Sequence, residues 1–356
     1  MIRRTAKPTR TFVSLTGPAG NIGDALIRRG TLEWAKGTSD ELIAYVGEAP
    51  DVWLKQLGVP DGTRVLRGKK SVAKWLWLLA TSRRRPVLVL EAGEVPLHKG
   101  NGLRELVFLA ETLIVRLKRG VVVRPPRGIR GATQPSLWFH SLAAKATQVA
   151  LWRDAVSARL VGSTTVVPDI GFADVRDGRP WAERHELLVS LRGARPLPNA
   201  EWVAAVKTFA AEQRLTIRTV VQVREDEERS RELADALGAT FEPWEADAVT
   251  QEATLCDRYD AAKLVISDRM HVLVLAALGG AVPVELVPNP TAKITQAFAA
   301  VGLHGITGDA TKADMLAFLA AQIGRADEVR ERMVAAAARL ADIESSVRDT
   351  IRQARA

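Results

Sequence analysis

The stretch of sequence that decides the fold is Lys263-Leu-Val-Ile-Ser-Asp-Arg-Met-His271, which continues without a break into Val-Leu-Val-Leu-Ala-Ala-Leu. A short β-branched run ends at Ser267 and Asp268, and a helical pattern begins immediately after it. We therefore expect Arg269 and His271 to lie in the first turn of a helix, at the carboxyl end of a parallel strand. Open α/β sheets bind their ligands at that edge, and helix N-termini favour anions. The segment predicts a site for an anionic substrate that also needs a proton moved.

Strand-like and helix-like segments alternate on both sides of this stretch, which is typical of βαβ units and a mostly parallel sheet. A polar, turn-rich segment, Ala-Asp-Val-Arg-Asp-Gly-Arg-Pro-Trp at 173–181, interrupts the alternation. A chain of 356 residues is too long for one ordinary core and fits two domains. We predict an α/β protein with two doubly wound, Rossmann-like domains at residues 1–175 and 176–335, followed by a C-terminal helix at 336–356. Glycosyltransferases of the GT-B type have this arrangement.

Composition is that of a globular protein with a single cysteine, Cys256, which excludes an internal disulfide framework and suits a reducing compartment. The basic start of the chain, residues 1–10, leads into no apolar signal core. No apolar run approaches the roughly 18 residues of a membrane-spanning helix. We therefore expect a cytoplasmic protein.

The net charge of +9 is unevenly distributed. Residues 62–86 contain eight Lys or Arg and no acid around Trp75 and Trp77, residues 115–130 contain six more, and acidic runs such as 225–228 balance them later in the chain. A basic, Trp-bearing patch suits an anionic membrane surface, nucleic acid or an anionic lipid-linked substrate, and it is equally consistent with a solvated basic face. Because both tryptophans lie among leucines, we expect insertion into a core or an interface rather than stacking on RNA.

A glycine-rich segment, Gly17-Pro-Ala-Gly-Asn-Ile-Gly-Asp24, follows one predicted strand and opens a helix. It matches neither the dinucleotide-binding Gly-x-Gly-x-x-Gly pattern nor a P-loop. Two interpretations remain open. Gly20 and Gly23 allow a ligand to approach the backbone; alternatively they serve a tight turn, with Asn21 as helix cap and Asp24 complementing the helix dipole.

Three further cations fall at or near predicted strand ends: Arg153, Arg192 and Lys293. Each alone is also consistent with a surface arginine or a salt-linked helix start. Together with Arg269 they predict an anion site, because guanidinium groups suit phosphate and carboxylate. Two carboxylates in Glu91-Ala-Gly-Glu94 also follow a predicted strand. The five histidines have no metal-ligand spacing, and we predict no metal site.

Six short motifs occur in a familiar order along residues 10–303. They are Gly-Asn-Ile-Gly-Asp at 20–24, Arg-Asp-x-x-Ser at 153–157, Pro-Asp-x-x-Phe at 168–172, Ser-Asp-Arg-Met-His at 267–271, Gly-Gly to Pro at 279–283 and Asn-Pro-x-x-Lys at 289–293. In this order they resemble the polysaccharide pyruvyl transferase family. The resemblance implies a GT-B-like enzyme that moves pyruvate from phosphoenolpyruvate onto a sugar of a cell-surface polysaccharide or lipid-linked precursor. The product is a ketal, phosphate is released, and no cofactor is required.

The resemblance implies donor binding and proton transfer for Arg269 and His271, a phosphate or carboxylate contact for Arg153, and loop contacts for Asn21 and Asp24. The chemistry of the implied reaction extends these roles to residues outside the motifs. His271 becomes the proton donor, and Asp24, Glu91 or Glu94 the base for the sugar hydroxyl. The donor would be bound by Arg269, Arg153, Arg192 and Lys293, and the remaining loop contacts would come from Gly20, Asn21 and Gly23. The Glu91–Glu94 loop departs from the Gly-Gly-Gly turn of many relatives, which puts its acceptor contacts in doubt.

The partners expected on this basis are phosphoenolpyruvate, a glycan or lipid-linked acceptor and an anionic membrane surface at the inner face, but not nucleic acid. Two other functions remain open from the residues alone. A nucleotide-sugar-dependent GT-B glycosyltransferase would use the same helix N-terminus for its diphosphate. A basic membrane- or nucleic-acid-binding module explains the charge but not the cations at strand ends.

Overall fold

The computed structural model describes residues 9–82, 85–245 and 247–355, and the chain forms two compact units. Unit 1 comprises residues 1–19, 24–170 and 340–356, and unit 2 comprises residues 20–23 and 171–339. The sequence pattern predicts the boundary at 175. In the structure, residues 20–23 belong with the second unit and the last residues belong with the first, which no local pattern indicates.

Unit 1 is built on one parallel sheet of seven described strands in the order β3-β2-β1-β4-β6-β5, with β7 also paired to β6. The strands are β1 (Arg10–Ser14), β2 (Glu41–Tyr45), β3 (Arg64–Leu66), β4 (Val87–Val89), β5 (Gly93–Pro96), β6 (Val121–Arg130) and β7 (Val149–Trp152). The helices are α1 (Ile22–Ala35), α2 (Asp51–Leu57), α3 (Ser71–Thr81), α4 (Gly102–Leu117), α5 (Ser136–Lys145) and α6 (Ala155–Leu160).

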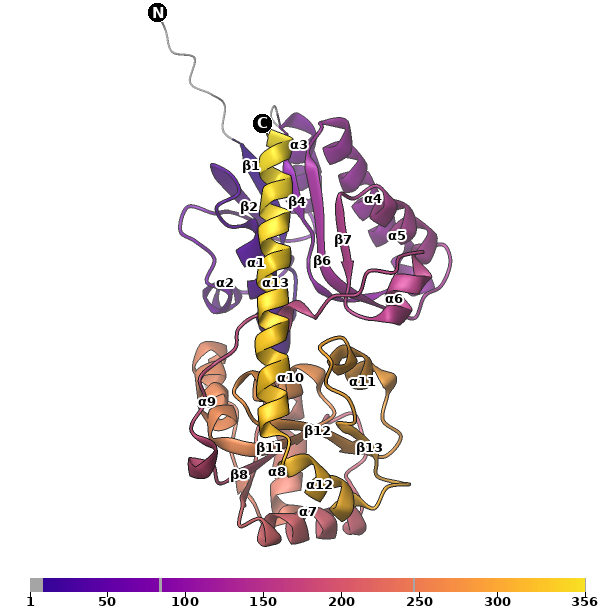
Figure 1. Ribbon diagram of the computed structural model, residues 1–356. Coiled ribbons are helices and arrows are strands. Elements are labelled where there is room, and N and C mark those ends of the chain that lie inside the picture. Colours follow the sequence, from indigo (N-terminus) through magenta and orange to yellow (C-terminus); the bar gives the residue numbers. More distant parts are fainter. Residues whose placement is uncertain (1–8, 83–84, 246, 356) are drawn as a thin grey trace, which may run out of the picture. The chain divides into compact units, whose positions relative to one another are not determined.

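Helices cover both faces of this sheet, because successive residues of each strand point to opposite sides. On β1, Val13 packs in a cluster with α1, α2 and the C-terminal part of α13 (Ala326–Arg355), whereas Phe12 packs in a second cluster with α3 and α4. Figure 1 shows α13 running over the sheet of unit 1. Strands buried on both faces explain the uninterrupted apolar runs in the sequence.

Strand β6 extends to Arg130, whereas the sequence predicts a strand that ends at Val123. The difference arises because two prolines, Pro125 and Pro126, interrupt the apolar pattern in the middle of the strand. The strand pairs with β4 through Val121–Val123 and with β5 through Arg127–Arg130, and the prolines fall between these two pairings. The β7 pairing shifts register over the same residues. A proline has no N–H to donate to a sheet, so it is tolerated at such an irregularity. The prolines therefore prevent the second half of the strand from being predicted from the sequence pattern.

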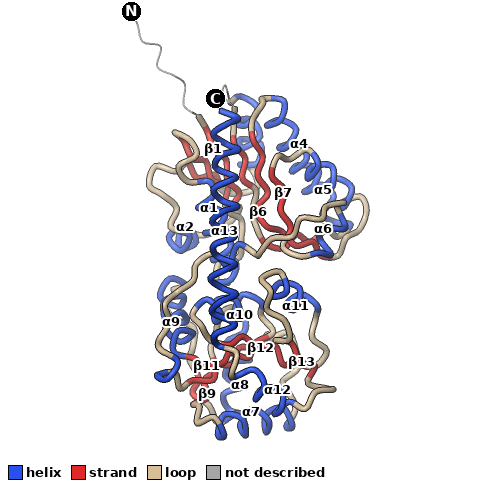
Figure 2. The backbone as a smooth tube through the Cα atoms, in the orientation of Figure 1, coloured by secondary structure: helices blue, strands red, loops and turns tan. Residues whose placement is uncertain are grey.

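Unit 2 is a second parallel sheet, with six described strands in the order β10-β9-β8-β11-β12-β13. The strands are β8 (Glu186–Ser190), β9 (Thr216–Thr219), β10 (Thr240–Phe241), β11 (Ala262–Ser267), β12 (Val282–Val287) and β13 (Thr307–Asp309). The helices are α7 (Ala200–Glu212), α8 (Glu227–Leu237), α9 (Ala248–Ala261), α10 (Met270–Leu278), α11 (Ala292–Ala299), α12 (Met315–Ile323) and the start of α13. Figure 2 shows the strands of each unit enclosed by helices.

Two Rossmann-like units and a C-terminal helix confirm the predicted fold class. The helix itself, α13, is longer than predicted: it begins at Ala326 and its residues are divided between the two units. No helix among the described residues is both long enough and apolar enough to cross a membrane.

The structure changes the interpretation of the basic stretches. Arg83 and Arg84 of the first stretch, and most of the basic residues 1–10, lie outside the described residues. In the second stretch Arg124 and Arg127 are fully buried, so they do not contribute to a surface patch. Of the two tryptophans, Trp75 is a core residue and Trp77 is 60% exposed. The predicted patch is therefore smaller and lies on α3 and α4.

Candidate functional site

The predicted strand-end site in unit 2 forms at three adjacent strands, β9, β8 and β11. Arg192 follows β8, Asp226 follows β9, and Asp268 and Arg269 follow β11, so all four reach the carboxyl edge of the sheet. Helix α10 begins at Met270, directly after β11, as the opening stretch of sequence predicts. Its first N–H groups have no partners within the helix and, with the helix dipole, favour an anion at this edge.

The Arg269 guanidinium is held by Asp226 through two hydrogen bonds. Its Nε donates to Asp226 Oδ2 at 2.8 Å and its Nη2 donates to Asp226 Oδ1 at 2.8 Å. The carboxylate is buried and also accepts a hydrogen bond from the backbone N–H of Gly193 at 2.9 Å. The third guanidinium nitrogen, Nη1, makes no hydrogen bond to the described residues, and the side chain is 24% exposed. Asp226 therefore orients the Arg269 guanidinium and leaves its Nη1 group accessible to a ligand.

A second buried carboxylate, Asp268, organises two more arginines. Its Oδ1 accepts a hydrogen bond from the backbone N–H of Arg192 at 2.9 Å, and its Oδ2 lies 3.1 Å from Nε of Arg195. The Arg192 Nη2 group also donates to the Asp268 carbonyl at 2.8 Å. Three arginines therefore surround two aspartates, which leaves one net positive charge at the strand ends.

The glycine-rich segment forms one wall of this site. Asn21 makes an antiparallel bridge with Val223, and the Arg224 N–H donates to the Gly20 carbonyl at 3.0 Å. Gly20 has a φ of +92°, a conformation that glycine adopts readily. A Cβ atom on Gly23 would lie 2.6 Å from the His271 Cβ, so the first turn of α10 packs directly on Gly23. The segment is in unit 2 because of these contacts.

Two more charged residues lie near the same strand ends. Glu285, on β12, is buried, and burial raises its pKa to about 7, helped by the charge of Asp268, although a hydrogen bond from Thr307 opposes the shift. Lys293 is the second residue of α11, a helix that contacts α10. Of the predicted residues, Arg192, Arg269, His271, Gly20, Asn21 and Gly23 are thus brought together in unit 2.

Arg153 belongs to unit 1 and has a fold-building role there. Its Nη1 donates to Asp169 at 2.7 Å and its Nη2 donates to Glu94 at 3.0 Å, with the side chain 5% exposed. These charges raise the pKa of the guanidinium against the effect of burial. A Cβ on Gly128 would lie 2.6 Å from Arg153 Nε, so the guanidinium is also packed against backbone. Donor binding by Arg153 stays a prediction.

The predicted carboxylates also lie in unit 1. Asp24 is in the first turn of α1, where it complements the helix dipole. Glu94 pairs with Arg153 and Arg130. Glu91 is buried and, although burial alone would raise its pKa, the charges of Arg127, Arg104 and Arg28 hold the pKa down to about 2. Whether one of these carboxylates acts as a base stays a prediction.

Sequence reasoning missed Asp226, Arg195 and Glu285. Asp226 lies in the acidic run 225–228, whose charge pattern alone indicates only that it balances the basic stretches. Its position between a strand end and a helix start was the available signal. Arg195 and Glu285 carried no comparable signal.

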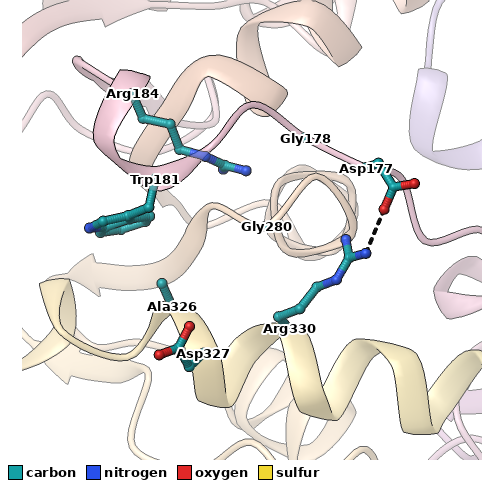
Figure 3. Close-up of a pocket in the computed structure, with 8 residues that line it drawn as sticks. All are labelled: Asp177, Gly178, Trp181, Arg184, Gly280, Ala326, Asp327 and Arg330. Atoms are coloured by element: carbon teal, nitrogen blue, oxygen red, sulfur yellow. Dashed lines mark hydrogen bonds and ion pairs between the residues drawn. The ribbon is translucent and has the colours of Figure 1, made fainter.

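A small pocket of about 210 Å³ also lies in unit 2, near the amino end of β11, and Figure 3 shows its lining. Arg184 in its wall donates to the carbonyls of Ala262 and Gly279, and Arg330 pairs with Asp177. These arginines hold backbone and loop together, which explains their presence without a ligand. Among the described residues, no group of three or more His, Cys, Asp or Glu side chains is placed to hold a metal ion.

No protein-family model matches the sequence, and no curated protein matches it. Solved structures do share its fold. Anabaena Alr3699/HepE in complex with UDP has a TM-score of 0.59 at 14% identity, over 97% of this chain and 100% of that chain. UDP-GlcNAc 2-epimerase from Neisseria meningitidis bound to UDP-GlcNAc has a TM-score of 0.55 at 9% identity, over 91% and 94%. A mutant O-GlcNAc transferase from Thermobaculum terrenum has a TM-score of 0.50 at 13% identity, over 98% and 68%.

These comparisons correct the resemblance to polysaccharide pyruvyl transferases. The structures that share the fold are named for UDP, UDP-GlcNAc or O-GlcNAc, and no family model supports the pyruvyl transferase motifs. The prediction of phosphoenolpyruvate as partner is wrong for the same reason. Two of the motifs have structural explanations: Arg153 pairs with Asp169 of the Pro-Asp motif, and Asp154 caps α6 by accepting from the Ser157 N–H.

Proposed function

We propose that the protein is a GT-B enzyme that binds a nucleoside diphosphate sugar, with the diphosphate at the carboxyl edge of the unit 2 sheet. The observation that carries the proposal is the Arg269–Asp226 pair at the start of α10, where an oriented guanidinium meets a helix N-terminus. The names of the structures that share the fold support a nucleotide of the UDP type.

The site suits a diphosphate in charge and in shape. Asp226 fixes two nitrogens of Arg269 and leaves Nη1 for a phosphate oxygen. Gly20 carries no side chain that would keep a ligand from the backbone, and Gly23 allows the first turn of α10 to pack directly against it. The net positive charge of the cluster offsets part of the charge of the ligand.

The reaction we propose is transfer of the sugar to a hydroxyl group of an acceptor. The bond between the anomeric carbon and the diphosphate oxygen breaks, and the nucleoside diphosphate leaves with the electron pair. The acceptor oxygen forms the new bond to the anomeric carbon and releases its proton to water. In this reaction Arg269 and the N-terminus of α10 stabilise the charge that develops on the leaving diphosphate, and we assign to His271, in the same turn, the donation of a proton to it.

Calorimetric titration with UDP, UDP-GlcNAc and uridine tests the site. We expect UDP and UDP-GlcNAc to bind and uridine to bind at least about tenfold more weakly, because the diphosphate supplies most of the contacts. Arg269→Ala should abolish the preference for UDP over uridine. Arg258→Ala is the matched control, since Arg258 also pairs with a carboxylate in unit 2 but lies beside Glu186 at the amino end of β8. Equal losses in both variants, or no UDP binding by the parent protein, would refute the proposal.

Sugar transfer and epimerisation are distinguished by following the conversion of UDP-GlcNAc over time. Acceptor-dependent release of UDP supports transfer. Because one structure with this fold is named a UDP-GlcNAc 2-epimerase, the sugar itself must also be monitored. Inversion at its C2 without acceptor would replace transfer by epimerisation and leave the diphosphate site unchanged.

A further inference from the structure

A second site lies in unit 1, in a pocket of about 730 Å³. This volume is in the range of about 300–1,000 Å³ that is typical of small-molecule sites. The floor is at the carboxyl ends of β1, β2 and β4, and the sides are formed by α3, α4 and the loop before α4. The lining residues on the two helices are Val72, Trp75, Leu103, Arg104, Val107, Phe108 and Glu111.

The interior of the pocket is apolar and has a fixed shape. Trp75 is 3% exposed, and its ring packs against Phe12 at 5.2 Å and Tyr45 at 5.9 Å between ring centroids. Its Nε1 donates to Glu111 Oε1 at 3.0 Å, which fixes the ring across the gap between α3 and α4. An indole fixed by two ring contacts and a hydrogen bond forms a preformed wall for an apolar ligand.

The mouth of the pocket is cationic. Lys69 and Arg104 are exposed and line it, while the Glu48 carboxylate, which accepts a hydrogen bond from the Lys69 backbone N–H at 3.2 Å, offsets part of this charge. In the floor, the Glu91 carboxylate is compensated by Arg104 at 2.8 Å and Arg127 at 3.5 Å. Burial raises the pKa of Glu111 to about 8, so this carboxyl is mostly neutral at pH 7. Neither carboxyl group therefore opposes an anion at the mouth.

An exposed apolar stripe continues from the pocket along α4. Leu103, Leu106, Leu113 and Leu117 recur on one face of the helix, and Leu103, which lines the pocket, is 75% exposed. A ligand with an apolar body would cover part of this surface as well as the interior. The apolar walls and the cationic mouth together specify a molecule with two different ends.

We propose that this pocket binds an anionic amphiphile, with its apolar part between α3 and α4 and its phosphate or carboxylate against Lys69 and Arg104. Binding at this pocket does not depend on nucleotide binding in unit 2. If the proposed function holds, the anionic amphiphile is the acceptor of the sugar. Only this assignment as acceptor rests on the proposed function.

The test is calorimetric titration of the full chain with octyl phosphate below its micelle concentration, with octyl glucoside and inorganic phosphate in parallel. We expect octyl phosphate to bind at least about tenfold more tightly than either, because each of these probes offers only one of the two ends. Equal binding of octyl glucoside would overturn the anionic part of the proposal, and absence of octyl phosphate binding would overturn the whole.

Matched variants locate the site. Val107→Trp and Val72→Trp fill the pocket from its two sides, whereas Leu160→Trp adds the same ring to the exposed face of α6, which does not line the pocket. Loss of octyl phosphate binding in the first two and retention in the third is the expected result. Similarly, Arg104→Gln should weaken binding about tenfold and Arg116→Gln, on the same helix, should not. Folding of each variant is checked by its melting curve.

If Val107→Trp, Val72→Trp and Arg104→Gln all bound octyl phosphate as tightly as the parent protein, the amphiphile would bind elsewhere. The two sites are tested separately, because Val107→Trp should leave UDP binding intact and Arg269→Ala should leave octyl phosphate binding intact. A chain that binds octyl phosphate but no UDP would remove the proposed function and keep the amphiphile site. The converse would remove only this inference.

Discussion

The guanidinium of Arg153 lies between two carboxylates, Asp169 and Glu94, and its neighbour Arg130 contacts the same Glu94 from a more exposed position. Side-chain exposure is 5% for Arg153 and 52% for Arg130. Removing one member of a buried ion pair leaves the other charge without compensation, whereas exposed pairs contribute little.

We therefore expect Arg153→Met to lower the free energy of unfolding by about 3–5 kcal/mol and Arg130→Met to lower it by less than about 1 kcal/mol. Urea denaturation of both variants and the parent protein measures the difference. If the two variants were equally stable, Arg153 would be free for the ligand contact that its motif first suggested.

Gly23 is constrained by the side chain opposite it. An alanine there would be favourable for helix α1 by propensity alone, but its Cβ would lie 2.6 Å from the Cβ of His271. We expect Gly23→Ala to displace His271, to cost about 1–3 kcal/mol of stability and to weaken UDP binding at least about tenfold. Gly324→Ala is the control, since its Cβ would meet nothing within 4 Å. Unchanged binding in Gly23→Ala would separate the glycine-rich segment from the nucleotide site.

Glu111 makes the stability of unit 1 depend on pH, and the direction of that dependence follows from its pKa. Its pKa is raised from 4.5 to about 8 by burial, with the charge of Glu91 acting in the same direction. Between these values the native state holds a proton that the unfolded chain has lost, so this group makes stability fall as pH rises, until about pH 8.

Glu111→Gln keeps an acceptor for the Trp75 indole but removes the titration. The stability of the variant relative to the parent protein should therefore increase between pH 5 and pH 9, measured by urea denaturation at both values. A relative stability that does not change with pH would mean that Glu111 titrates in its ordinary range.

At the scale of elements, the alternation of apolar runs and amphipathic segments predicted the fold class and the β11–α10 junction that carries Arg269 and His271. It did not predict Asp226 as the partner of Arg269, because that contact depends on the strand order β9-β8-β11. Strand order follows from how whole layers pack, and no local pattern encodes it.

The same limit applies to β5 and to the second half of β6. A strand of four residues that contains Gly93 and Pro96, and a strand interrupted by Pro125 and Pro126, have no apolar periodicity to read. Arg124 and Arg127 were consequently assigned to a surface patch, although both are fully buried in the sheet of unit 1, where Arg127 lies over the ring of Phe108 on α4. Burial of charge is decided by tertiary partners such as Glu91, which contacts Arg127.

For the whole molecule, helix α13 has a special place because residues 340–356 belong to unit 1. Val347 and Ile351 are each 2% exposed in the core cluster that also contains α1 and β1. Full burial of two aliphatic side chains contributes about 3–6 kcal/mol.

A chain that ends at Arg339 should therefore have a destabilised unit 1 and an intact core in unit 2. Hydrogen exchange should speed up in β1, β2 and β4 much more than in β8, β11 and β12. The double variant Val347→Asp/Ile351→Asp in the full chain should give the same pattern, which separates loss of the contacts from loss of chain length. Uniform exchange across both sheets would contradict the division of α13 between the units.

This division also orders events during synthesis. Unit 1 contains most of the residues that leave the ribosome first, but the last pieces of its core, Val347 and Ile351, follow well over a hundred residues after its final strand. Unit 2 has no comparable wait, since residues 171–339 form its sheet and nearly all of its core. The nascent chain thus carries an exposed apolar face on its first sheet until residues 340–356 have been synthesised, and that face is where a ribosome-associated chaperone would be needed most.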